Sequence, residues 1–422
     1  MPHHAPAGNY YLKFDLAAPE GWTYAPGDTI IGNLVRKTQI VTPEAVITLS
    51  FTGRVKVKIT HAAGNSKHVY RDSWELLNSE SVIFQGPLHL AAEDGDLFAK
   101  SPLTWPISVD IPYKPKPIPR GKVHNSFFPR DNPGHPGYRT LPGSFHSEGQ
   151  VYGSWWACYV EYYLRARLRY NFGGVAHSHE AVCPILVRYP AAESSQLSVP
   201  KTLRGNFLRR VTSQRLFPGM ENAELSVKQH VQKFFYSSKL PSFNYALHLT
   251  VPAAIQLDNP IPIPLQVEVV PDLAGTSGSI KDVAQRIRVV EIQAILISRT
   301  HGLALSKVRE SPRDYKYEQK TDLNLQRAFA ALESPLIITT GKGNEPVHVG
   351  NMFQLTLGSQ GLRTGNRRLH PSWKKGLSQI YPDFTTYNIQ HKHTIEWKIR
   401  VNIVGEPQEH NYFAQTEIIA PA

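Results

Sequence analysis

The longest regular pattern in the chain runs from Ala45 to Ile59, where apolar and polar residues alternate. Side chains of a β-strand point to opposite faces in turn, so alternation predicts a half-buried strand. The expected core face holds Ala45, Ile47, Leu49, Phe51, Val55, Val57 and Ile59. The opposite face, which we expect to be wet and basic, holds Thr48, Ser50, Thr52, Arg54, Lys56 and Lys58.

A second alternating stretch, Trp155 to Phe172, repeats this design. Its expected core face holds Cys158, Val160, Tyr162, Leu164, Ala166 and Leu168, and its outer face holds Tyr159, Glu161, Tyr163, Arg165, Arg167 and Arg169. If the two stretches share a sheet, six cations line one surface. We therefore take as a candidate docking surface for an acidic tail or lipid Arg54, Lys56, Lys58, Arg165, Arg167 and Arg169.

The remaining pattern consists of short strands separated by Gly, Pro and Asn turns, and one stretch, Asp322 to Glu333, has helical spacing. At 422 residues the chain exceeds one ordinary core. We predict an all-β protein of two tandem immunoglobulin-like β-sandwich domains with at most one short helix. The domains are residues 1–190, with a long Pro/Gly-rich insertion at 113–149, and residues 201–422, joined by a linker at 191–200.

Composition narrows the class of partner. The formal net charge is +12 and the pI about 9.5, which favours acidic or phosphorylated protein tails and anionic membrane surfaces. No nucleic-acid-binding motif accompanies the charge, so nucleic acid is not expected as a partner. Two cysteines exclude a disulfide scaffold. Without a signal-like N-terminus or a long apolar run, we expect a cytoplasmic protein.

Motifs for catalysis and cofactor binding do not occur. The chain contains no Gly-x-Ser-x-Gly, no Gly-Lys-Ser/Thr phosphate loop and no His-Glu-x-x-His. His177-x-His179 and His391-x-His393 each place two imidazoles on one face of an extended segment, but neither has an assignable third ligand. We therefore predict no enzyme activity, no cofactor and no metal site.

Several short motifs follow one another in the order of a known family. They are Tyr24-Ala25-Pro26-Gly27-Asp28 with Gly32, the strand Ile47 to Gly53, Trp105-Pro106-Ile107 through Pro112, Leu141 to Phe145, Tyr159 to Leu164, Val251-Pro252 with Ile261 to Val269, and Phe384 to Ile389. Through these motifs, which span nearly the whole chain, it resembles the arrestin superfamily, and within it the α-arrestin branch of arrestin-related trafficking adaptors.

The resemblance implies the arrestin fold, two β-sandwiches called the arrestin N-terminal and C-terminal domains. It also implies a non-enzymatic adaptor that binds cytosolic parts of membrane proteins in endocytosis and protein transport, peripheral to the plasma membrane or endosomes. α-Arrestins act as ubiquitin ligase adaptors, recruiting a HECT-type ligase through Pro-Pro-x-Tyr motifs that bind WW domains. Here the nearest segment is His135-Pro136-Gly137-Tyr138, which lacks the first proline. Pro136 and Tyr138 are thus a degenerate WW-ligand candidate, and the ligase is an indirect partner.

Two other readings remain open. One is a structural trafficking subunit of the arrestin fold, similar to the retromer branch. The other is a ligand- or carbohydrate-binding β-sandwich protein, which secretion or an aromatic sugar platform would favour; an enzyme built on a β-sandwich ranks third.

Overall fold

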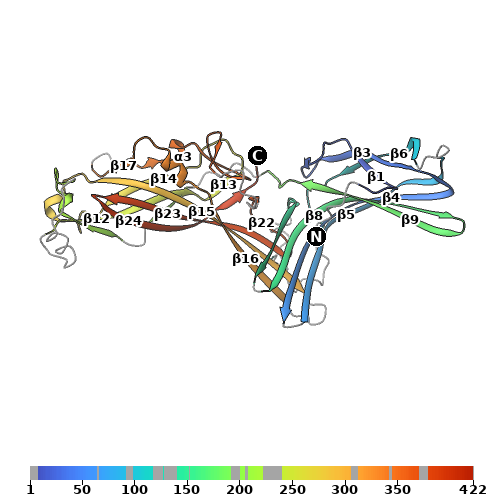
Figure 1. Cartoon of the computed structure of the whole chain (residues 1–422), viewed down its shortest axis with the longest axis horizontal. Coiled ribbons are helices and arrows are strands. Elements are labelled where there is room, and N and C mark those ends of the chain that lie inside the picture. The colour runs from blue at the N-terminus through green and yellow to red at the C-terminus, as the bar shows by residue number, and fades with distance from the viewer. Residues whose placement is uncertain are drawn as a thin grey trace. The chain divides into compact units, whose positions relative to one another are not determined.

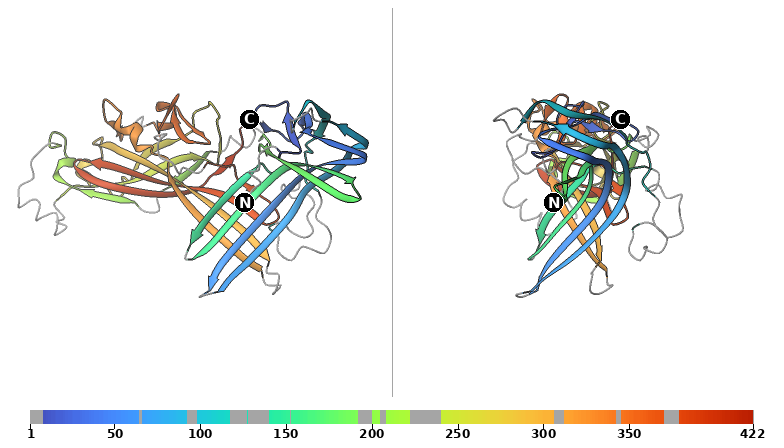
Figure 2. Two further views of the ribbon diagram at one scale, coloured as in Figure 1. Left: turned by 45° about the vertical axis from the view of Figure 1, so that its right-hand side comes forward. Right: turned by 90° about the vertical axis from the view of Figure 1, so that its right-hand side faces the viewer.

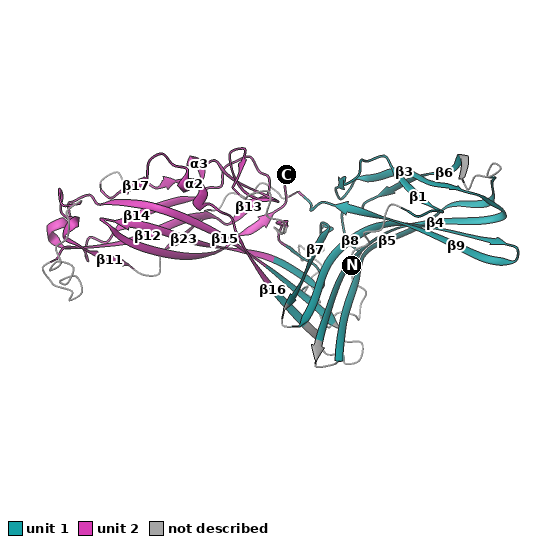
Figure 3. Cartoon of the chain, in the orientation of Figure 1, with its two compact units in different colours: residues 1–190, 299–317, 384–391 teal, residues 191–298, 318–383, 392–422 magenta. Residues whose placement is uncertain are grey.

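The computed structural model describes residues 8–63, 66–91, 98–116, 127, 140–151, 153–191, 200–204, 208–221, 240–305, 312–341, 345–369 and 379–421. Strands dominate this part of the chain, and the predicted all-β class is confirmed. The chain divides into two compact units (Figure 3). Unit 1 contains residues 1–190, 299–317 and 384–391, and unit 2 contains residues 191–298, 318–383 and 392–422.

Unit 1 is built on two sheets (Figure 1). The larger has the strand order β2-β9-β8-β4-β5, with β7 also pairing β8, and the smaller has the order β1-β3-β6. The bounds are β1 Lys13–Leu16, β2 Thr23–Tyr24, β3 Thr29–Thr38, β4 Ile40–Ala63, β5 Ser66–Leu90, β6 Phe98–Asp110, β7 Phe145–Val151, β8 Ser154–Phe172 and β9 Val175–Val187. Figure 2 shows β4, β5 and β8 as long strands lying side by side.

The apolar half of each alternating stretch forms the core of unit 1. On β4 and β8 all the residues predicted to face the core are buried, among them Phe51, Val57 and Leu164. From the smaller sheet, Trp105 packs against Phe84 of β5, with ring centroids 5.8 Å apart. The alternation therefore predicted correctly which side of each strand is apolar and buried.

One part of the pattern was read wrongly. On β8 the polar-facing Tyr159, Glu161 and Tyr163 are also buried, with 5%, 7% and 3% of their surface exposed. Long side chains on neighbouring strands cover this face, so it is only partly wet. Alternation reports which side a residue points to, and it does not report how far its neighbours reach over it.

Residues 299–317, which come late in the chain, belong to unit 1. The ring of Tyr315 stacks on Trp156 of β8, with centroids 5.0 Å apart. A side chain at position 302 would lie 2.7 Å from Sγ of Cys158, so Gly302 permits close approach of this segment to the sheet. Unit 1 thus packs its first 190 residues against a segment that comes more than 100 residues later in the chain.

Residues 384–391 also join unit 1. Tyr387 packs against Trp74 of β5, with centroids 5.2 Å apart, and the side-chain amide of Asn388 donates to Asp72 over 3.2 Å. Burial raises the pKa of Asp72. The linear division expected at 191–200 includes neither of these two segments in the first domain.

The turn before β3 has the chemistry that its sequence predicts. Gly27 has φ of 94°, a value that glycine adopts without strain. The backbone N–H of Ala25 donates to the Asp28 carboxylate over 2.7 Å. Ile111, at the end of β6, exchanges backbone hydrogen bonds with this turn, which ties the turn to the smaller sheet.

Unit 2 is likewise built of sheets. The described sheets have the orders β10-β12-β14-β18 with β11 on β12, β16-β15-β23-β22 with β17 and β24, and β19-β20-β21, beside the parallel pair β13-β25. The bounds are β10 Pro200–Arg204, β11 Arg209–Thr212, β12 Ser242–Pro252, β13 Ala254–Gln256, β14 Gln266–Pro271, β15 Arg286–Leu305, β16 Pro312–Asp322, β17 Leu336–Thr339, β18 Val347–His348, β19 Leu355–Gly358, β20 Gly361–Thr364, β21 Arg367–Arg368, β22 Phe384–Thr385, β23 Ile389–Ile403, β24 Glu406–Gln415 and β25 Glu417–Ile419. By residue membership, β22 and the ends of β15, β16 and β23 belong to unit 1. One apolar cluster of β12, β14, β15 and β23 side chains forms the core of unit 2.

Helices are short and differ from the prediction. A helix is predicted over Asp322–Glu333, but only Gln326–Ala330 are helical, forming α2. A second helix, α3, spans Val349–Met352. Two 3₁₀ turns, η3 Gln214–Leu216 and η4 Gly278–Ile280, complete the described helical elements. Asn324 has φ of 58° and lies two residues before α2, next to its N-cap residue Leu325, which explains why the helix begins late. The expectation of at most one helix was therefore wrong.

The insertion at 113–149 is only partly described. Its last residues are not irregular, because Phe145–Val151 form β7 and pair with β8. The pairing is local, from Val151 opposite Ser154 to Phe145 opposite Val160, but the Pro- and Gly-rich composition upstream concealed this strand.

Gly53 generates a prediction for the stability of unit 1. A Cβ at this position would lie 2.6 Å from the ring of buried Tyr162 and 2.9 Å from Cγ of buried Leu77. We expect Gly53→Ala to destabilise the protein by about 1–3 kcal/mol, because neither neighbour has room to move. Urea denaturation measures the change, with Thr52→Val on the partly exposed face as the control. Equal stability of both variants would contradict this packing.

His410 predicts how stability depends on pH. Burial, reinforced by the charge of Arg209, lowers the pKa of His410 to about 4, and its Nε2 lies 3.0 Å from the Tyr245 hydroxyl. The unfolded chain binds this proton near the ordinary value of 6.5. Folding stability should therefore fall as the pH drops from about 6.5 to about 4, by about 3 kcal/mol from this residue. Denaturation across that range should show a shallower slope for His410→Gln, and an unchanged slope would refute the assignment.

Candidate functional site

The pairing of β4 with β8 brings the six predicted cations onto one face of the large sheet. In this antiparallel register Ser50, Thr48 and Val46 lie opposite Arg165, Arg167 and Arg169, while Arg54, Lys56 and Lys58 lie opposite Glu161, Tyr159 and Ala157. Residues directly opposite each other point to the same side. We call the surface formed by these six cations the cation face.

The two triplets occupy different halves of the cation face. Along β4 the register runs from Val46, opposite Arg169, to Lys58. Twelve residues of strand at about 3.3 Å each make a row roughly 40 Å long. The pair Thr52 and Tyr163 lies between the halves, so the face is a linear array and not a compact cluster.

Glu161 offsets part of the positive charge of the first half. Its carboxylate forms an ion pair and hydrogen bond with Nε of Arg54 and lies 3.6 Å from Nζ of Lys56. Burial, then the neighbouring charge of Arg54, lowers the pKa of Lys56, and Glu161 acts in the opposite direction. A buried carboxylate with two cationic partners fixes these side chains in place.

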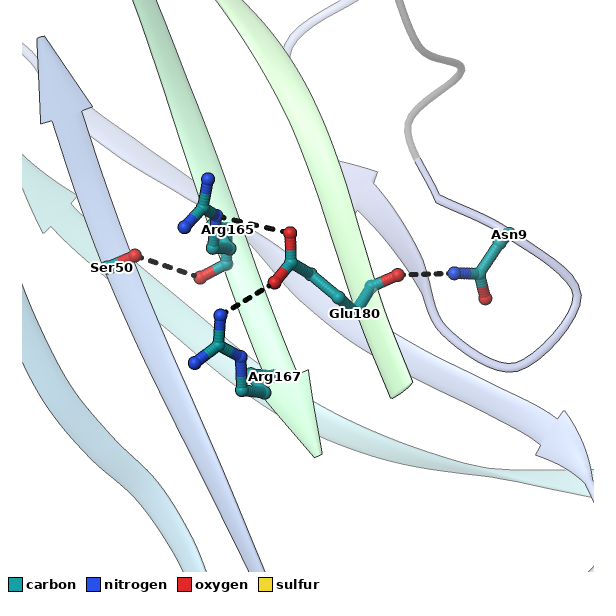
Figure 4. A network of polar contacts seen from close by, with 5 residues as sticks. All are labelled: Asn9, Ser50, Arg165, Arg167 and Glu180. Atoms are coloured by element: carbon teal, nitrogen blue, oxygen red, sulfur yellow. Dashed lines mark hydrogen bonds and ion pairs between the residues drawn. The ribbon is translucent and has the colours of Figure 1, made fainter. Parts of the chain in front are cut away.

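Glu180 of β9 plays the same part in the second half (Figure 4). Its two carboxylate oxygens lie 3.3 Å from Nε of Arg165 and 2.9 Å from Nη2 of Arg167. Its backbone carbonyl accepts a hydrogen bond from the side-chain amide of Asn9. Unlike Glu161, Glu180 is 37% exposed, so solvent screens these pairs and an incoming anion can compete for them.

Aromatic rings separate the charged groups. The guanidinium groups of Arg54 and Arg165 lie over the ring of Tyr163, at 5.0 and 5.4 Å from its centroid. Nζ of Lys56 lies over Tyr159 at 5.6 Å. Cation–π contacts of this kind hold the cations at defined positions without cancelling their charge.

Among the described residues, the cations without an ion pair lie at the two ends of the array. Among the described residues Lys58 and Arg169 form no ion pair, and Nζ of Lys58 lies over the Trp155 ring at 4.9 Å. The neighbouring strand β5 places Arg71 opposite Lys58, Glu75 opposite Arg54 and Glu80 opposite Ser50. On the β5 side, the edge of the cation face is thus acidic near its centre, at Glu75 and Glu80, and basic at the end next to Lys58.

Sequence reasoning found all six cations but missed Glu180. β9 begins at Val175 and puts Glu180 directly opposite Arg167. The polar residues before Ala181 alternate weakly, so the only available signal was the hairpin formed around Gly173-Gly174.

The other sequence candidates have separate surroundings. Pro136 and Tyr138 lie outside the described residues. The ring of His179 stacks between Tyr11 and Tyr170, and burial, followed by the charges of Arg36 and His177, lowers its pKa. His391 contacts the Thr300 hydroxyl over 2.9 Å, and His393 contacts the Asp383 carboxylate over 2.6 Å. Within the described chain no group of three or more His, Cys, Asp or Glu side chains is arranged to bind a metal.

Comparisons with known proteins do not assign the chain to a family. No protein-family model matches it, and a search of curated proteins finds no match. Within the described part of the chain, no helix combines the length and apolar composition that crossing a membrane requires.

The two glutamates provide a matched test of this geometry. We expect Glu161→Gln to lower stability by about 1.5–3 kcal/mol, because Arg54 and Lys56 lose a buried charged partner. Glu180→Gln should cost less than about 1 kcal/mol, because its pairs are exposed to solvent. Chemical denaturation of both variants at one salt concentration measures the difference, and the reverse order would contradict the burial of Glu161.

Proposed function

We propose that the protein is a non-enzymatic, arrestin-like adaptor that binds acidic or phosphorylated cytosolic tails of membrane proteins. The observation that carries the proposal is the cation face, a row of six basic side chains on two paired strands. The ordered resemblance of its motifs to α-arrestins supports the same conclusion. In this proposal the protein works in the cytoplasm, peripheral to the plasma membrane or endosomes, in endocytosis and protein transport.

The dimensions of the cation face favour an extended peptide. A row of about 40 Å matches about 12 residues of extended chain. Guanidinium groups bind phosphate and carboxylate oxygens strongly, and Arg165 and Arg167 already hold one oxygen each of the Glu180 carboxylate. A tail phosphate would replace the Glu180 carboxylate there, while Lys58 and Arg169 would attract anionic groups at the two ends.

In this proposal, ubiquitination requires a second protein that recruits the ligase. The sequence contains no Pro-Pro-x-Tyr motif, so a HECT-type ligase would be recruited indirectly. Proximity labelling in the native cell tests the adaptor role as a whole: membrane transporters or receptors, with or without a ligase, are expected. Recovery of soluble enzymes alone would refute the adaptor role.

Peptide binding tests the cation face directly. The probe is a fluorescent acidic peptide of about 12 residues carrying several phosphoserines, and anisotropy gives its Kd. We expect the double variant Arg165→Glu/Arg167→Glu to weaken binding by about tenfold or more, because it replaces attraction by repulsion. Glu180→Gln should strengthen binding several-fold, because the phosphate no longer competes with an internal carboxylate.

The control variant reverses two arginines of unit 2. Arg286 and Arg288 are exposed on β15, so Arg286→Glu/Arg288→Glu changes the net charge by the same amount without touching the cation face. Equal losses in both double variants would mean that net charge alone attracts the peptide. Unchanged binding in Arg165→Glu/Arg167→Glu would refute the docking surface.

A further inference from the structure

The turn between β8 and β9 ends the hairpin with two apolar side chains. Phe172 and Val175 lie directly opposite each other, and 60% and 59% of their surfaces are exposed. Between them, Gly173 and Gly174 have φ of 59° and 78°, which closes the strands with a tight two-residue turn. The four residues of this tip, Phe172 to Val175, therefore carry no polar side chain.

Ring contacts hold this tip in position. The Phe172 ring lies edge-on to His177, with centroids 6.4 Å apart, and His177 stacks on Tyr170 at 5.2 Å. Figure 1 shows the hairpin, in green, ending at the far end of the larger sheet of unit 1. The exposed pair is thus displayed by a rigid element, so little order is lost when it binds.

Polar and basic groups lie immediately behind the tip. Arg169, which is exposed, precedes Phe172 by three residues, or about 10 Å along the strand. Beside it lies a groove of about 460 Å³, whose lining combines polar side chains such as Arg169, Asn171 and Ser178 with the small apolar residues Ala45, Val46 and Ala176. Glu44 is the acidic side chain in this lining, and the Arg165 and Arg167 side chains follow further along β8.

We propose that the β8–β9 hairpin tip inserts into the surface of an anionic bilayer. Phe172 and Val175 enter the boundary between headgroups and acyl chains, and Arg169 reaches the lipid phosphates about 10 Å behind them. This is the depth at which interfacial segments bury apolar groups and keep cations in the headgroup layer. The inference rests on the proposed peripheral location at membranes and does not require tail binding.

The size of the tip favours a bilayer over a protein partner. A stable protein interface buries about 1,200–2,000 Å² with a complementary surface, and two adjacent side chains at a turn supply a small part of that. A bilayer needs no complementary shape, since its boundary layer adapts to an inserted wedge. The order of groups along the hairpin, apolar at the tip and basic about 10 Å behind it, also matches the order of acyl chains and phosphates in a bilayer.

Vesicle binding tests the proposal with the full chain. The probes are vesicles of phosphatidylcholine alone and of phosphatidylcholine with about 30% phosphatidylserine, an anionic lipid. We expect Phe172→Ser/Val175→Ser to reduce co-sedimentation with the anionic vesicles by about tenfold, and Arg169→Gln to reduce it several-fold. The control is Phe413→Ser, because Phe413 of β24 is 62% exposed but belongs to unit 2 and not to this hairpin.

A fluorescent label reports insertion itself. Cys158 and Cys183 are both buried, so Val175→Cys adds one accessible thiol for an environment-sensitive dye. We expect its emission to shift to the blue and intensify with anionic vesicles. Unchanged emission, or equal vesicle binding by the wild type and Phe172→Ser/Val175→Ser, overturns the proposal. The proposal is also overturned if Phe413→Ser loses as much vesicle binding as Phe172→Ser/Val175→Ser. Capture of a soluble protein by the tip, without lipid binding, likewise overturns it.

The phosphopeptide assay separates this inference from the proposed function. Phe172→Ser/Val175→Ser should keep the wild-type peptide Kd, because neither residue belongs to the cation face. If the wild type binds peptide but not vesicles, the hairpin proposal fails and the adaptor remains. If it binds vesicles through the tip but not peptide, the hairpin proposal holds and tail docking fails.

Discussion

The antiparallel pairing of β4 with β8 is the constraint on which unit 1 depends. Its register, from Ala45 opposite Tyr170 to Thr60 opposite Trp155, sends the alternating apolar positions from Ala45 to Ile59 and from Cys158 to Leu168 to the core. The same register sends both basic triplets to the other face. A shift by one residue would exchange the two faces of a strand, burying arginines and exposing the core. The core thus fixes the register, and the register creates the cation face.

Much of this could be predicted from the sequence because strand alternation is a local signal. Periodicity identified the buried side of β4 and β8 and all six cations. It did not reveal that Glu180 lies among them, because this depends on where β9 begins and on its pairing with β8. Nor did it reveal that Tyr163 is buried on the polar side, since that depends on the reach of side chains from adjacent strands. Pairing and coverage are set by residues distant in sequence, and a single sequence carries little record of them.

The same limit applies to the membership of unit 1 and to the predicted helix. Residues 299–317 pack against β8 through Tyr315 and Gly302, yet their own pattern reads only as ordinary strand. The helix predicted over Asp322–Glu333 has the right periodicity, but the left-handed backbone at Asn324 and the packing of Leu325 into the unit 2 core delay its start. Local propensity indicates that a helix forms here, and tertiary packing determines at which residues it begins and ends.

The electrostatics of the cation face follow from the cost of burying charge. Six cations side by side would repel one another, and partial burial would favour their neutral forms, as it does for Lys56. Glu161 and Glu180 each contact two of the four interior cations and offset part of their charge, while Lys58 and Arg169 stand at the ends of the array. Arg169 therefore stands at the junction of the two proposed activities, at one end of the peptide row and behind the apolar tip of the same hairpin. A tail that emerges from a membrane would begin near lipid headgroups, so a row that starts at the inserted tip and runs away from it would meet that tail in sequence order.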